Sequence, residues 1–266
     1  LREEFEAKME EQKEKARSAR EVVMEKGQDS FIEEFYDKYG VTEFTGYEKT
    51  EDEGKLLSLR EAKDRKYLLI FDKTPFYAES GGQVGDQGKI YSDNFAGKVL
   101  DVQKQKDIFI HTVKLEKGMP EENKTYKLEV DVVKRLDTAK NHTATHLLHK
   151  ALREIVGTHV QQAGSLVDSE KLRFDFSHYE ALTEEQLSKI EDTVNEKIRE
   201  GIEVVVSHYS IEEAKKLGAM MLFGDKYGDV VRVVEVPGFS VELCGGSHVG
   251  NTAFISSFRL TSEAGI

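Results

Sequence analysis

Two short motifs, each holding two side chains that can bind a metal ion, constrain the fold of this chain most strongly. In His142-Thr-Ala-Thr-His146, a helix would place both imidazoles within one turn on the same face. In Cys244-Gly-Gly-Ser-His248, the only cysteine of the chain precedes another histidine, and two glycines let the backbone turn tightly. One cysteine and three histidines complete a tetrahedral zinc set, so the fold is expected to bring these four side chains together.

Each motif alone has a simpler interpretation. Two solvated surface histidines would explain the first motif, because a helix over 138–156 directs its apolar side chains to the opposite face: Ala144, Leu147, Leu148, Ala151 and Ile155. The histidines are therefore expected to point away from the core. His149 falls on the ligand face one turn further, and we interpret it as a neighbour of the site rather than a fifth ligand.

The role of the metal stays open at this stage. The zinc-protease motif has glutamate directly after its first histidine as the general base, and here Thr143 stands at that position. Four protein ligands favour a closed, structural zinc site, whereas a catalytic site keeps one position open. An active role would require that one ligand yields or that zinc only orients the substrate.

The order of apolar and turn-forming residues predicts an α+β fold in three segments. Residues 1–45 are expected to be helical, with helices over 1–27 and 30–39. Residues 46–133 carry short alternating runs, typical of a small β-barrel, at 67–71, 89–91, 97–102, 108–113 and 126–132. Residues 134–266 mix helices and strands as a two-layer α/β sandwich. Capping boxes at Thr183 and Ser210 begin two helices there, and strands are expected at 172–176, 202–209, 230–236 and 254–260.

Two further features suggest a binding surface. The loop 74–88 is rich in glycine but lacks the Gly-Lys-Ser/Thr of a phosphate loop, so it is a hairpin turn or a loop whose bare backbone lets a ligand approach. Its centre is Gly81, Gly82 and Gln83. Gln161 and Gln162 would face opposite sides of a strand end, so one could line a pocket, although solvent exposure is the default for either.

Charge and cysteine content limit the class of protein. The net charge of −12 excludes a general nucleic-acid coat, because phosphate binding draws on clustered lysine and arginine. Only residues 61–160 carry slightly more basic than acidic groups, and this stretch holds the glycine loop and the histidine helix. A single cysteine excludes a disulfide framework and suits a reducing compartment. No apolar run reaches membrane-spanning length. A cytoplasmic protein without a membrane partner is expected.

The motifs together resemble the editing domain of alanyl-tRNA synthetases. The resemblance rests on both metal motifs, on Gly164-Ser-Leu-Val and on Arg173-Phe-Asp-Phe-Ser-His178. Ala78-Glu-Ser-Gly-Gly-Gln-Val-Gly-Asp86 resembles the family's barrel subdomain, and Phe5-Glu-Ala-Lys-Met-Glu-Glu-Gln12 resembles the helical stretch between its two modules. Val84 and Ser247 depart mildly from the family pattern, which often has proline and threonine there. A fragment of a longer synthetase is therefore expected.

The resemblance implies both an activity and a set of roles. The activity is hydrolysis of serine, and of glycine, from tRNA for alanine, with the acceptor end of that tRNA as partner. One Zn²⁺ would be bound by His142, His146, Cys244 and His248, and the editing domain would span 134–266. Gln162, Gly81, Gly82 and Gln83 would border the substrate. No side-chain base is identified, so a metal-oriented water is the expected nucleophile, and ATP would serve only the absent aminoacylation domain.

Two other classes remain. One is a freestanding hydrolase that edits the same mischarged tRNA. The other is a zinc-stabilised tRNA-binding module without catalysis, which four protein ligands would permit.

Overall fold

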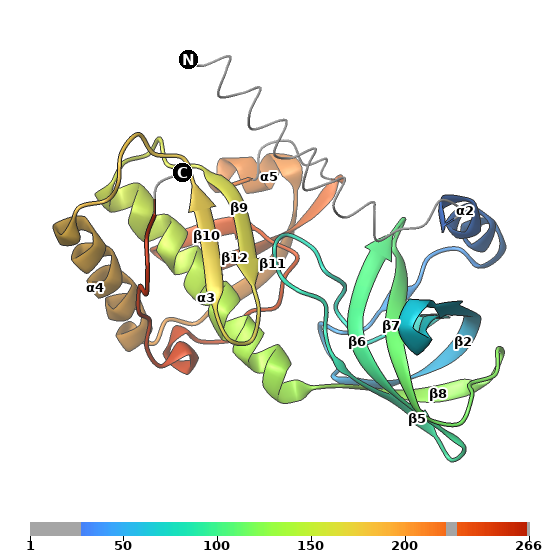
Figure 1. Ribbon diagram of the computed structural model, residues 1–266. Coiled ribbons are helices and arrows are strands. Elements are labelled where there is room, and N and C mark those ends of the chain that lie inside the picture. The colour runs from blue at the N-terminus through green and yellow to red at the C-terminus, as the bar shows by residue number, and fades with distance from the viewer. Residues whose placement is uncertain (1–27, 222–227, 265–266) are drawn as a thin grey trace.

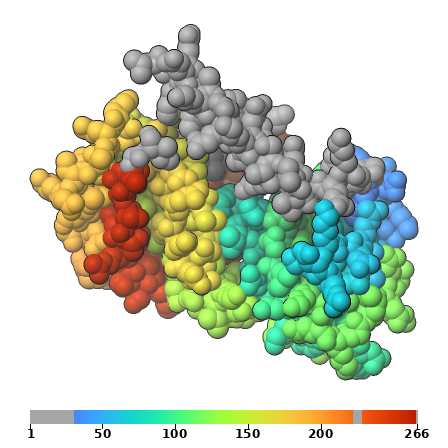
Figure 2. Space-filling view, in the orientation of Figure 1, coloured from blue at the N-terminus to red at the C-terminus, as the bar shows by residue number. Residues whose placement is uncertain are grey.

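The computed structural model describes residues 28–221 and 228–264, so the helix predicted over 1–27 lies outside the described residues. The chain is α+β, with a barrel on one side and a mixed group of helices and strands on the other (Figure 1). The space-filling view shows the two parts as adjoining masses (Figure 2). Among the described residues, no helix is long and apolar enough to cross a membrane.

The predicted barrel is confirmed as a closed sheet with the strand order β2-β3-β7-β6-β5-β8. Its strands are β2 (Glu51–Ala62), β3 (Lys66–Phe71), β5 (Gly88–Ser92), β6 (Phe95–Gln105), β7 (Ile108–Lys117) and β8 (Thr125–Val130). The short strands β1 (Glu43–Phe44) and β4 (Lys73–Thr74) pair with each other beside it, and a 3-10 turn covers Lys63–Arg65. Helix α2 (Gln28–Tyr39) packs Ile32 and Phe35 onto the barrel.

Strand β2 is the barrel strand that the sequence did not predict. It begins with three acidic residues, and its inward positions include Gly54 and Ser58 as well as Leu56. The apolar alternation that marks a half-buried strand is therefore weak along β2. Pairing with β3 and β8 on its two sides places it in the barrel nonetheless.

The second part is built around the long helix α3 (Val132–Ile155), which follows β8 after one residue. Its other elements are β9 (Gln162–Val167), β10 (Leu172–Phe176), α4 (Glu184–Glu200), β11 (Val205–Ser210), α5 (Ile211–Lys216), β12 (Val230–Val236), β13 (Ser240–Leu243) and the 3-10 turn η2 (Thr252–Ile255). The strands form two sheets, the hairpin β9–β10 and the antiparallel sheet β11-β12-β13. Apolar residues of α3, α4 and these sheets share one core.

The predicted strand over 254–260 is wrong. This segment contains the end of η2 and then an irregular stretch, although its side chains alternate. Its backbone is bound by side chains of α4 instead of by a neighbouring strand: Asn195 exchanges two hydrogen bonds with Phe258, and Glu191 accepts one from Leu260. The strand predicted at 202–209 is real but begins only at Val205.

A buried ion pair joins the two parts. The Nε of Arg135, on α3, donates to both carboxylate oxygens of Asp86 in the glycine loop at 2.9 Å. The same guanidinium donates to the carbonyls of Gly46 and Pro75, both at 2.8 Å. The side chains of Arg135 and Asp86 are 11% and 6% exposed. The glycine loop is thus held against the helix that carries His142 and His146.

Candidate metal centre

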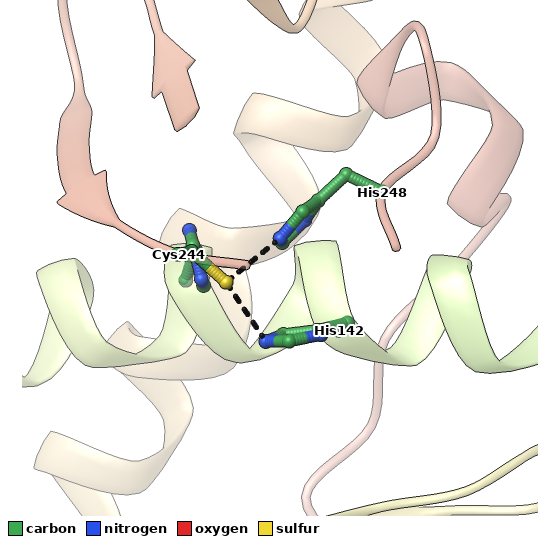
Figure 3. Close-up of side chains that lie close together, drawn as sticks. His142, Cys244 and His248 are labelled. Atoms are coloured by element: carbon green, nitrogen blue, oxygen red, sulfur yellow. Dashed lines mark hydrogen bonds between the residues drawn. The ribbon is translucent and has the colours of Figure 1, made fainter. Parts of the chain in front are cut away.

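The two histidine and cysteine motifs meet in the structure. His142 and His146 lie on α3, while Cys244 and His248 lie in the loop that follows β13. One ligand atom from each of these four side chains lies within 4.8 Å of every other. The Sγ of Cys244 is 3.4 Å from Nε2 of His142 and 3.3 Å from Nε2 of His248 (Figure 3). The predicted meeting of the motifs is therefore confirmed.

The alternative of two solvated histidines is wrong. His142 and His146 are each 5% exposed, although they lie on the face of α3 opposite its apolar stripe. The Cys244–His248 loop covers that face, and so does Gln83 from the glycine loop, which is fully buried. Both sides of α3 are therefore buried, one by the core and the other at the group of His142, His146, Cys244 and His248. We call this group the metal-binding cluster, after the ion that it could hold.

A protein side chain holds the second ring nitrogen of two of the candidate ligand histidines. The Nδ1 of His142 is 2.8 Å from Oε1 of Gln83, an oxygen that also accepts from the backbone N–H of Ser247. The Nδ1 of His248 is 3.0 Å from Oγ1 of Thr143. Such bonds fix the tautomer and leave Nε2 for a metal ion. Gln83 and Thr143 thus orient two candidate ligands, a role the sequence did not assign to Thr143.

His146 supplies an observation that tests the fit of a metal ion. Its Nδ1 is buried and has no hydrogen-bond partner among the described residues, while its Nε2 lies 3.8 Å from the carboxylate of Glu242. Buried polar atoms need a partner, and a bound cation would supply one. The donor set of one thiolate and three imidazoles is also one that zinc prefers. The residues present therefore fit a zinc ion.

The electrostatic environment of the cluster favours a cation. Burial would raise the pKa of the Cys244 thiol, but the three neighbouring histidines outweigh burial and hold that pKa well below its usual range. Burial alone would also raise the pKa of Glu242, and His146 and His149 lower it instead. Burial would lower the pKa of His146, yet Glu242 and Cys244 raise it to about 9. Burial lowers the pKa of His248 to about 3. The shifts of Cys244 and Glu242 both favour the negatively charged form, which a bound cation would neutralise.

Three contacts hold the loop that carries Cys244 and His248. The guanidinium of Arg232, on β12, donates to the carbonyls of Cys244 at 2.7 Å and Gly246 at 3.0 Å. The hydroxyl of Tyr47, next to the barrel, donates to the carbonyl of Gly245 at 2.6 Å. Gly246 lies so close to the ring of His142 that a Cβ there would overlap it. The second glycine of the motif is therefore required by packing.

Sequence reasoning missed three of these residues, for different reasons. Glu242 shares the alternation of β13 with Ser240 and precedes Cys244 by two positions, so its place on the same face could have been inferred. Tyr47 and Arg232 belong to no motif and reach the loop only through the tertiary fold.

A cavity of about 360 Å³ opens beside the cluster. His142, His146 and Cys244 line it, and so do two of the predicted substrate residues, Gly81 and Gln162. Gln161 is exposed, as expected for the opposite face of the strand end.

The other two predicted substrate residues lie behind the cavity wall. Gly82 has φ +88°, and a Cβ there would come within 2.7 Å of Ser165. Gln83 lies behind His142. These two residues therefore shape the loop and orient a ligand histidine from positions that do not face the cavity.

Comparison with known proteins identifies the family. The family described as tRNA synthetases class II (A) matches residues 2–134, and the domain described as threonyl and alanyl tRNA synthetase second additional domain matches residues 231–266. The alanine–tRNA ligase of Fusobacterium nucleatum subsp. nucleatum is 94% identical over 266 residues, which are the whole of this chain and 31% of that relative.

More distant relatives agree. The alanine–tRNA ligases of Listeria innocua and Alkaliphilus metalliredigens are 50% and 48% identical over 272 residues, again 31% of each relative. The chain thus spans about a third of the length of the curated relatives it matches. It belongs to the class II tRNA synthetases, as part of an alanyl-tRNA synthetase.

Proposed function

We propose that the cavity beside the metal-binding cluster hydrolyses the ester that joins wrongly attached serine or glycine to the tRNA for alanine. The observation that carries this proposal is the buried group of one cysteine and three histidines that lines a cavity of about 360 Å³. The match to the second additional domain of threonyl and alanyl tRNA synthetases supports it. In the whole ligase, an ATP-dependent domain outside this chain would attach alanine to the same tRNA.

Physical chemistry explains why such a ligase needs a second site. A pocket built for the methyl side chain of alanine rejects an added hydroxyl by only about 10²-fold, and glycine is smaller still. A separate site that recognises the wrong amino acid removes the resulting errors. The size of the cavity fits an aminoacyl group on the terminal nucleoside of tRNA better than it fits a folded nucleic acid.

Different residues of the chain would have different roles in this reaction. His142, His146, Cys244 and His248 would hold Zn²⁺, which supplies Lewis-acid polarisation of the ester carbonyl when bound. Gln83 and Thr143 fix the orientation of two of these ligands. Gly81, which has no side chain, and Gln162 both line the cavity and would contact the substrate there. The segments 46–133 and 134–266 would act as barrel and editing domain, with 1–45 as the helical link.

The four-ligand cluster also suits a second function. If all four side chains bind the ion, the zinc would be structural and the chain would bind tRNA without catalysis. A deacylation assay on the purified chain separates the two functions. Ser-tRNA and Gly-tRNA for alanine should lose their amino acid while Ala-tRNA keeps it, and Cys244→Ala should lose both zinc and turnover. Binding of tRNA without turnover by the zinc-loaded chain would favour the second function.

A further inference from the structure

His149 is a further buried histidine beside the metal-binding cluster. It lies on α3 one turn after His146, lines the same cavity and is 6% exposed. Its Nε2 has no hydrogen-bond partner among the described residues, and its Nδ1 makes no well-formed bond but lies 3.4 Å from the carboxylate of Glu242. In the ligands His142 and His248, by contrast, both ring nitrogens have partners within the cluster. His149 is therefore a buried polar group that still needs a partner.

Neighbouring side chains fix the orientation of the His149 ring. Its Nδ1 lies 3.4 Å from Oε1 of Glu242, and the hydroxyl of Ser240 donates to that same oxygen at 3.1 Å. The ring of Phe174 packs against it with a centroid distance of 5.1 Å. A carboxylate beside Nδ1 favours the tautomer that carries its proton there, which leaves the lone pair on Nε2. The group left to meet a ligand is thus a hydrogen-bond acceptor.

We propose that Nε2 of His149 accepts a hydrogen bond from the side-chain hydroxyl of a seryl group in the cavity and so selects serine against alanine. This inference rests on the proposed editing function and deepens it. It assigns His149 a role in specificity that is separate from the metal ligands and from the hydrolytic step.

The acceptor Nε2 of His149 would explain why seryl and glycyl groups bind in the cavity and an alanyl group does not. Serine offers an O–H that satisfies Nε2. Glycine leaves the space open, so a water molecule can make the same bond. Alanine places a methyl group there, which excludes water and leaves the buried acceptor unpaired. A site built to pair with a hydroxyl strongly disfavours an analogue that lacks it, because the polar group of the site loses its partner.

Binding to the unmodified chain tests the inference without turnover. The probes are adenosines that carry a seryl or an alanyl group through a stable amide at the 3′ position, titrated by calorimetry into the zinc-loaded chain. We expect the seryl probe to bind about 10- to 100-fold more tightly than the alanyl probe. Equal affinities would overturn the inference, and this measurement holds even if every variant of His149 fails to fold.

Two variants then separate the ring nitrogens. His149→Asn keeps a donor near the position of Nδ1 for Glu242 but removes the acceptor, whereas His149→Gln keeps a polar group near the position of Nε2. In His149→Asn we expect the seryl preference to fall to within about threefold, and in His149→Gln to remain in large part. Zinc content should stay at the level of the unmodified chain in both, as in the control His208→Asn, whose side chain is exposed.

Turnover distinguishes specificity from chemistry. His149→Asn should slow hydrolysis of Ser-tRNA by about 10- to 100-fold and that of Gly-tRNA by less than about threefold. An equal loss for both substrates would assign His149 to proton transfer or to general positioning and would overturn the inference. If the unmodified chain hydrolyses neither substrate but prefers the seryl probe, the proposed function fails while the role of His149 stands.

Discussion

The candidate metal centre depends on single hydrogen bonds made by residues that are not ligands. Gln83 is the strongest case, because its amide oxygen accepts hydrogen bonds from both Nδ1 of His142 and the backbone N–H of Ser247. Its amide nitrogen donates to the hydroxyl of Ser247 at 3.2 Å. One side chain therefore orients the candidate ligand His142 on α3 and fixes the loop that carries Cys244 and His248.

Replacement of Gln83 should weaken metal binding without removing a ligand. We expect Gln83→Ala to lower zinc affinity by about 10- to 100-fold, the usual effect of losing the partner of a ligand histidine. Competition with a chromophoric chelator measures the affinity. Gln161→Ala is the matched control, since Gln161 is exposed in the loop between α3 and β9. If Gln83→Ala binds zinc as tightly as the control, Gln83 does not orient His142.

Residue chemistry also marks the limit of what the sequence could predict about the site. The four ligand candidates were recognisable because the two in each motif are only four positions apart in the sequence. Their orienting partners were not, because Gln83 is separated from His142 by 59 positions and Tyr47 from Gly245 by 198. Gln83 was singled out for its place in the glycine loop, which predicts a border residue and not a buried hydrogen bond.

At the level of elements, the sequence predicted the starts of α4 and α5 well and the start of α3 poorly. Both capping boxes, at Thr183 with Gln186 and at Ser210 with Glu213, are present and begin α4 and α5. Helix α3 begins at Val132, six positions before the predicted start. Its first turns expose Val132, Val133 and Leu136, so their apolar pattern does not follow the buried face. Its cap is Asp131, whose side chain accepts from the backbone N–H of Lys134.

One buried histidine links two strands of the barrel to the short strand β4 beside it. His111 lies on β7 and is fully buried, with Nδ1 3.1 Å from the carbonyl of Leu69 on β3 and Nε2 2.8 Å from the hydroxyl of Thr74 on β4. The carbonyl can only accept, so Nδ1 carries the proton and Nε2 accepts from Thr74. The neutral ring therefore satisfies both contacts, and a second proton would place a positive charge in the buried interior.

Acid should destabilise the barrel through this histidine. Burial lowers the pKa of His111 to about 4, below the value of about 6.5 in an unfolded chain. The stabilisation is complete above pH 6.5 and is lost as the pH falls toward 4, because the unfolded chain then binds the proton more readily. Between pH 7 and 4.5 we expect a loss of about 2 kcal/mol from this residue.

Urea unfolding at the two pH values measures that loss. In His111→Gln the side chain cannot take up a proton in this range, so the variant should lose less stability between pH 7 and 4.5 than the unmodified chain. His208→Gln should behave as the unmodified chain does, since His208 is exposed. Identical pH dependence in all three proteins would contradict the role of His111.

At the scale of the whole molecule, the metal-binding cluster is assembled from both parts of the fold. The glycine loop supplies Gln83, the segment before β2 supplies Tyr47, and the second part supplies all four ligand candidates. The closed barrel was predictable from its short alternating runs, but its placement against α3 was not. The ion pair of Arg135 and Asp86 contributes to that placement, and the sequence shows these two only as ordinary charged residues 49 positions apart.

The Arg135–Asp86 pair should therefore be essential to stability and to metal binding together. Arg135→Met leaves the carboxylate of Asp86 buried without a cation and removes the bonds to Gly46 and Pro75. We expect a loss of about 3–5 kcal/mol in the free energy of unfolding, typical of breaking a buried pair from one side. Zinc affinity should fall as well, because the loop that carries Gln83 loses one of its attachments to α3 and Gln83 is then held less firmly against His142.

A double-mutant cycle separates the pair from its surroundings. Asp86→Asn removes the buried charge, so adding Arg135→Met to that background should cost clearly less than it does in the unmodified chain. Urea unfolding gives the free energies, and chelator competition on the same four proteins gives zinc affinity. If Arg135→Met costs the same in both backgrounds, the two side chains are not coupled, and the effect of Arg135→Met would then come from its lost bonds to the carbonyls of Gly46 and Pro75.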